Sequence, residues 1–169
     1  TIESVSSDYQ RWNLASFMGR VNYNYKDRYL LTVSARYDGS SRLAPGHKWV
    51  LFPSAALAWR VKEESFLKDV DCLSNLKLRL GWGITGNTAI DPYKTQGNLE
   101  YGRYSYGSNG VLAFYQKEMP NPNLSWEKTE QWNAGIDFGF LNGRIGGSVD
   151  LYLQNTNDLL MDRQLPIVS

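Results

Sequence analysis

Apolar and polar side chains alternate with a period of two along six segments of the chain. The clearest segment is 76–85, in which every second residue is apolar: Leu76, Leu78, Leu80, Trp82 and Ile84. Successive side chains of a strand point to opposite faces, so this pattern predicts strands with one apolar and one polar face. We expect antiparallel strands in up-and-down order, each pairing with its chain neighbour, over residues 14–25, 29–38, 53–62, 76–85, 127–140 and 144–155.

The connections between these segments differ in length. Residues 25–29 and 141–144 are tight turns, and Asn142-Gly143 is typical of a type I′ hairpin. Strand counting puts both tight turns on one side of the sheet and the long loops 38–52 and 86–125 on the other. Outer-membrane barrels, with short periplasmic turns and long extracellular loops, have this asymmetry. The intermediate connection, 63–75, falls on the tight-turn side, and we expect a short helix within it at residues 64–69.

Alternation is compatible with a soluble sandwich and with a membrane barrel, and the aromatic residues favour the barrel. Trp and Tyr concentrate where the apolar core of a bilayer meets the headgroups. The apolar faces carry aromatics at the tight-turn end (Tyr23, Tyr25, Tyr29, Trp59, Phe138 and Phe140) and at the long-loop end (Tyr37, Trp82 and Trp132). Six strands are too few to close a barrel around a useful lumen. The predicted fold is therefore an all-β, antiparallel up-and-down segment of a larger transmembrane barrel.

Composition excludes several other classes of protein. The chain has 169 residues with a net charge of +1, which argues against nucleic-acid binding. One cysteine and one histidine, Cys72 and His47, exclude an internal disulfide and a zinc cluster, and we expect no metal or other cofactor. No apolar run approaches the length of a transmembrane helix. Because the first residues lack both a signal peptide and an initiator Met, we expect a piece of a longer, processed protein.

No enzyme is indicated by the motifs. Residues 81–86 satisfy the dinucleotide pattern G-x-G-x-x-G, but a turn follows them where that motif needs a helix. The carboxylates between Glu63 and Asp71 stand beside lysines, which is typical of a solvated turn, and His47 has no nucleophile or carboxylate at a motif spacing.

The loop between Asn87 and Pro122 is rich in tyrosine and is the main candidate for ligand or partner contact. Tyrosine rings among small polar residues can stack on sugars or hold a peptide backbone, and they can equally pack the loop against itself or a partner protein. The alternative function, a soluble β-sandwich carbohydrate-binding module, would use the same loop. The candidate contact residues are Tyr93, Tyr101, Arg103, Tyr104, Tyr106 and Tyr115.

Five blocks in collinear order resemble the barrel of the SusC/RagA family of TonB-dependent outer-membrane transporters. They are residues 19–25, 29–42, 52–60, 76–87 and 123–129, and the resemblance extends over roughly 14–160. It implies a barrel of about 22 strands in a Bacteroidetes-type outer membrane, plugged by an N-terminal domain. It also implies a SusD-like surface lipoprotein as partner and import of oligosaccharides or peptides energised by TonB. The plug and the TonB box are not among these residues, so all of 1–169 is expected to be barrel, with 86–125 an extracellular loop.

Overall fold

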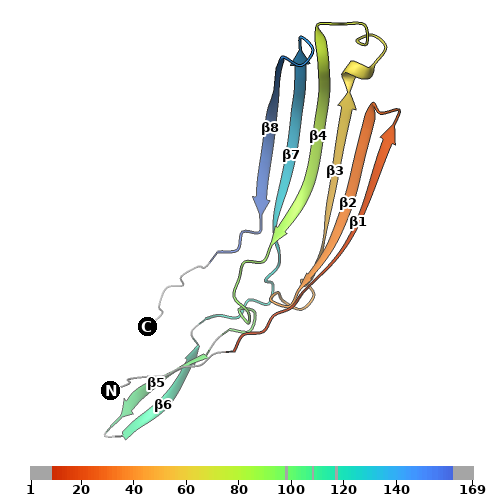
Figure 1. Cartoon of the computed structure of the whole chain (residues 1–169). Helices are drawn as coiled ribbons and strands as arrows, with labels where there is room; N and C mark the ends of the chain where they lie inside the picture. The colour runs from red at the N-terminus through yellow and green to blue at the C-terminus, as the bar shows by residue number, and fades with distance from the viewer. Residues whose placement is uncertain (1–8, 98, 108, 117, 162–169) are drawn as a thin grey trace.

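The computed structural model describes residues 9–97, 99–107, 109–116 and 118–161. They form one six-stranded antiparallel sheet, in the order β1-β2-β3-β4-β7-β8, and a two-stranded hairpin, β5-β6 (Figure 1). The strands are β1 (Leu14–Tyr25), β2 (Tyr29–Ser40), β3 (Trp49–Arg60), β4 (Leu73–Asn87), β5 (Leu99–Tyr106), β6 (Asn109–Gln116), β7 (Glu127–Phe140) and β8 (Ile145–Asn157). The predicted fold, an open segment of an antiparallel barrel, is confirmed.

The sheet is a tall, curved wall, and the hairpin projects beyond the end opposite the tight turns (Figure 1). Each strand of the wall pairs with its chain neighbour except at β4, which pairs with β7 because β5 and β6 lie between them in the chain. The long connection predicted between β4 and β7 is confirmed, but it also contains a hairpin that the alternation did not reveal. Likewise the predicted loop 38–52 is shorter, since β2 runs to Ser40 and β3 begins at Trp49.

Both tight turns have positive φ at their two central residues, as a type I′ turn requires. The first turn is centred on Lys26 and Asp27, with φ of 53° at each. In the second, Gly143 N–H donates to the Phe140 carbonyl at 3.1 Å, which makes Leu141 and Asn142 the central pair. The prediction of Asn142-Gly143 was therefore one residue out of register, and Gly143 instead follows the turn with φ of 80°.

The helix predicted at residues 64–69 is wrong. A 3-10 turn, η1 (Val61–Glu63), comes first, and successive turns follow it. The Lys62 ammonium donates to three backbone carbonyls, those of Leu67 (3.0 Å), Lys68 (3.1 Å) and Val70 (2.8 Å). The connection is thus wound around the Lys62 ammonium and forms turns in place of a regular helix.

The two faces of the wall have the polarity that the alternation predicts. Cross-strand rows such as Leu31, Leu57, Leu80, Ala134 and Leu151 lie on the apolar face, and Leu80 and Leu151 are 57% and 71% exposed. Over the described ranges, no second sheet packs on this face. A β-sandwich needs such a sheet, whereas a barrel wall meets lipid there. No helix among the described residues is long and apolar enough to cross a bilayer.

Candidate functional site

The polar face of the wall carries an ion-pair network that joins three strands. The guanidinium of Arg79 on β4 reaches Asp137 on β7 at 2.8 Å and Asp150 on β8 at 2.9 Å. Gly135, the register partner of both Arg79 and Asp150, leaves room for it, because a Cβ there would meet the guanidinium at 2.9 Å. Salt bridges at this exposure stabilise weakly, so the network mainly fixes the Arg79 side chain against the wall.

Between this network and the long-loop end, the polar face contains an uncharged hollow. A shallow cavity of about 260 Å³ is lined mainly by small and amide side chains, among them Thr32, Ser54, Gly81, Gly83, Gln131 and Asn133. Such a surface can donate and accept hydrogen bonds but presents no net charge. In the part of the chain that the structure describes, no three His, Cys, Asp or Glu side chains are grouped to hold a metal. The hollow therefore offers hydrogen-bonding groups and has no charged side chain in its lining.

A small hydrophobic core lies at the long-loop end. Leu43, Phe52 and Trp126 are 1–4% exposed, and the Phe52 and Trp126 rings meet edge to face at 5.4 Å. The core forms where β3 and β4 part, because their pairing extends only to Ser54 and Gly83 and ends beside Pro53. Proline has no N–H to continue the ladder. This core was not foreseen from the sequence, since its three residues lie on separate segments that alternation does not connect.

Loops around the core are fastened to one another by polar contacts. Arg42 lies over the Trp12 ring at 3.9 Å and donates to the Thr88 carbonyl at 3.4 Å. The hydroxyl of Tyr93 lies 3.3 Å from both the N–H and the carbonyl of Arg11. Among the candidate contact residues, Tyr93 thus lies at the stem of the hairpin, and its hydroxyl binds the backbone of Arg11 within this chain.

The other five candidate residues lie on the hairpin, and those whose side chains the structure describes are divided between its two faces. On one face of the hairpin, the register pairs Tyr101 with Phe114 and Arg103 with Leu112. On the other face it pairs Tyr104 with Val111 and Tyr115 with Glu100. Tyr101, Tyr104 and Tyr115 are 68%, 63% and 52% exposed. The Tyr115 hydroxyl donates to Glu100 at 3.2 Å. The structure thus leaves these rings available for contact but does not gather them into one site, and the side chain of Tyr106 lies outside what it describes.

Aromatic side chains ring the apolar face at both ends, as predicted. At the long-loop end the Trp49 ring stacks on Tyr37 at 5.0 Å and on Phe17 at 6.3 Å. The sequence placed Trp49 in a loop, but these cross-strand stacks hold it at the start of β3. At the tight-turn end Tyr29 stacks on Trp59 at 6.0 Å. Two aromatic bands around an aliphatic zone define the class of structure, a segment of membrane β-barrel wall.

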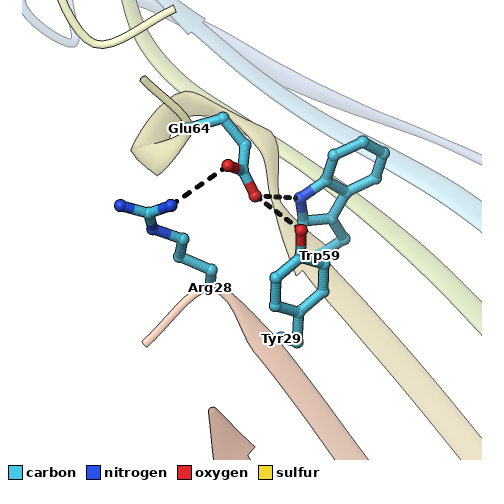
Figure 2. A network of polar contacts seen from close by, with 4 residues as sticks. All are labelled: Arg28, Tyr29, Trp59 and Glu64. Carbon is cyan, nitrogen blue, oxygen red and sulfur yellow. Dashed lines mark hydrogen bonds and ion pairs between the residues drawn. The ribbon is translucent and has the colours of Figure 1, made fainter. Parts of the chain in front are cut away.

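Sequence analysis missed the carboxylate that joins Tyr29 and Trp59. Glu64 accepts hydrogen bonds from the Tyr29 hydroxyl (2.7 Å) and the Trp59 indole N–H (3.1 Å), and Arg28 lies 3.1 Å away (Figure 2). Its side chain is only 13% exposed. The hydrogen bond from Tyr29, then that from Trp59, holds the pKa of Glu64 below its usual range. No sequence spacing signals this contact, because it depends on how the connection folds back over the sheet.

Comparison with known proteins gives the family. Residues 3–169 match the family described as TonB dependent receptor-like, beta-barrel, and the chain belongs to this family. It is 49% identical over 166 residues to the TonB-dependent receptor SusC of Bacteroides thetaiotaomicron, covering 93% of this chain and 16% of SusC. TonB-dependent receptor P26 of Formosa agariphila is 40% identical over 162 residues, 96% of this chain and 16% of the relative. The chain thus spans about one sixth of the length of these relatives.

Solved structures agree with the family. The chain superposes on the structure of the RagAB peptide transporter with a TM-score of 0.81 at 31% identity, covering 92% of this chain and 17% of that chain. The RagAB peptide importer in its open-open state gives the same TM-score and covers 98% of this chain and 18% of that one. These relatives are outer-membrane β-barrel proteins of Bacteroidetes, so this wall lies in an outer membrane, and the soluble sandwich alternative is wrong.

Proposed function

We propose that this chain forms part of the barrel wall of a TonB-dependent transporter that imports oligosaccharides or peptides across the outer membrane. The observation that carries the proposal is the division of the sheet into a lipid-facing apolar face with two aromatic bands and a polar face with an uncharged hollow. A wall of this kind separates lipid from a path for polar cargo. The relatives' names support nutrient import, since one is SusC and another is a peptide transporter.

We further propose a SusD-like surface lipoprotein as partner, and coupling to TonB through the N-terminal part of the transporter, outside these 169 residues. The β5-β6 hairpin supports the partner. An isolated two-stranded hairpin is marginally stable in water, and this one exposes Leu99, Tyr101, Tyr104, Phe114 and Tyr115. Contact with a second protein or with cargo would cover these side chains.

The test is replacement of Tyr101, Tyr104 and Tyr106 by Ala in the intact transporter. We expect cargo uptake to fall, on the order of tenfold, because tyrosines are frequent energetic anchors of contacts. Barrel assembly should be unchanged, since the hairpin lies outside the wall. Heat-modifiable migration of the folded barrel measures assembly, and co-purification measures lipoprotein binding.

The two faces of the hairpin provide matched controls. One variant replaces Tyr101 and Phe114 by Ala, and the other replaces Tyr104 and Tyr115. Loss of lipoprotein with one variant and of cargo binding with the other would assign a face to each partner. Unchanged uptake and unchanged co-purification in all three variants would refute a contact role for the hairpin.

A further inference from the structure

The arrangement around Glu64 occurs a second time, at the other end of the apolar face. Trp82 and Trp132 are cross-strand partners on β4 and β7, with ring centroids 6.0 Å apart. Their indole N–H groups both donate to one oxygen of Glu130, at 2.7 Å and 3.2 Å. In each case a pair of aromatic residues on neighbouring strands directs both polar tips to a single carboxylate oxygen.

Both carboxylates belong to the lipid-facing side of the wall. Glu130 precedes Trp132 by two residues, so it continues the outward face of β7, where its register partners are Ile84 and Asn155. Glu64 comes from the connection after β3 and reaches the outward Tyr29 and Trp59 at the tight-turn rim (Figure 2). An ionised carboxylate is costly in hydrocarbon, but it is well solvated among headgroups.

The aromatic pairs limit where the carboxylates can move. Tyrosine and tryptophan at a bilayer surface normally direct their polar atoms to water or headgroups. Here those donors are bound to the protein's own carboxylate, and the cross-strand contacts hold the rings in place. We propose that Glu64 and Glu130 fix the two levels at which the apolar core of the membrane ends on this wall. Each does so by tying an aromatic pair to a charge that has to remain in the headgroup layer.

The spacing of the apolar band agrees with this assignment. On β7 the outward residues from Phe140 to Trp132 are apolar, and Glu130 is the next outward residue. Eight steps of about 3.3 Å, tilted by about 40°, span roughly 20 Å along the membrane normal, near the apolar height of about 25 Å in such barrels. The polar limit on this strand therefore falls where the proposal places it.

The experiment measures the depth of spin labels in the full-length transporter, reconstituted in lipid vesicles with its native cysteines replaced, Cys72 included. Nitroxides are attached at positions 153 and 155 of β8, the outward neighbours of Trp132 and Glu130. Accessibility to oxygen marks hydrocarbon and accessibility to a nickel chelate marks the headgroup layer. We expect oxygen to dominate at 153 and nickel at 155. Oxygen dominating at 155 in the otherwise unaltered protein would overturn the proposal.

Variants of Glu130 then test whether the carboxylate sets the level. Glu130→Leu should convert position 155 to oxygen-dominated, a shift of about one outward residue, or roughly 5 Å. Glu130→Gln keeps an acceptor for the indole groups, which protects folding, and should shift the level in the same direction. Lys128→Gln is the matched control, because it removes the next outward charge on β7, and should leave the level unchanged. An unmoved level in both Glu130 variants overturns the proposal.

The opposite rim is tested with labels at positions 23 and 25 of β1, whose outward face continues the Tyr29 row. Glu64→Gln should move position 25 into the oxygen-dominated range. Glu63→Gln is the matched control, since Glu63 is an exposed neighbour in the same connection. Equal depths in the two variants would remove Glu64 from the proposal and show that its contacts only brace the turn.

Discussion

Gly86 provides the sharpest test of the packing at the long-loop end. A Cβ at this position would overlap the buried ring of Phe52, which is 4% exposed and held edge to face by Trp126. Because that ring has no free space to enter, we expect Gly86→Ala to destabilise by the cost of overpacking, about 1–3 kcal/mol. Gly81→Ala on the same strand is the control, since its Cβ would meet nothing nearer than 3.8 Å. It should stabilise by roughly 0.5–1 kcal/mol through reduced backbone freedom of the unfolded chain.

The assay is denaturant unfolding of the full-length protein in detergent, followed by heat-modifiable migration. Phe52→Ala alone should cost about 3–5 kcal/mol, because it empties a buried aromatic site. In the Phe52→Ala background the Gly86→Ala penalty should disappear, giving a coupling of about 1–3 kcal/mol. Equal effects of alanine at positions 81 and 86, or additive effects of the two changes at 52 and 86, would refute this account of the core.

Three further predictions concern the wall and its connections. Leu151→Arg should cost about 2–4 kcal/mol in a barrel-folding assay because Leu151 faces the middle of the lipid band, whereas Gln154→Arg on the polar face should be mild; equal costs would contradict the orientation. Lys62→Met should expose the connection after β3 to protease, because three carbonyls lose their donor, and Lys68→Met should not. The folded-state pKa of Glu64 is lowered, so ionised Glu64 stabilises the fold at pH values above the usual carboxyl range, and this stabilisation is lost as pH falls through the lowered pKa. The thermal unfolding midpoint of Glu64→Gln should therefore fall less on acidification than that of the parent protein.

Prediction from sequence succeeded for the wall because its strands are long and have one apolar face each. On β4 and β7 the alternation runs through at least four apolar positions, so a shift by one residue would invert the whole set and only one register fits. The aromatic bands were predictable for the same reason. Trp82 and Trp132 occupy corresponding positions on strands that the alternation already orients.

The remaining features depend on contacts that no local pattern encodes. The β5-β6 hairpin has apolar residues on both faces, such as Tyr101 and Tyr104, so its alternation is hidden. Glu130 meets Trp82 across 48 residues of chain only because the β4-β7 register brings them together. Glu64 meets Tyr29 only because Lys62 winds the connection back toward the sheet. The predicted position of the turn at Gly143 was wrong by one residue, because the Asn-Gly signal indicates a turn but not which two residues are central.

Pro53 connects the wall to the loops that carry the candidate contacts. On the tight-turn side of Pro53, β3 and β4 are joined by ladder hydrogen bonds. On its long-loop side the strands part, and Phe52 and Trp126 fill the gap. The Trp126 indole donates to the Lys48 carbonyl at 3.0 Å, and the N–H of Ala44 donates to Leu124 at 3.1 Å, so the loops are fastened to this core rather than to the sheet. A substitution in the hairpin beyond them therefore leaves the ladder intact, so the hairpin can vary in sequence without any rebuilding of the lipid-facing wall.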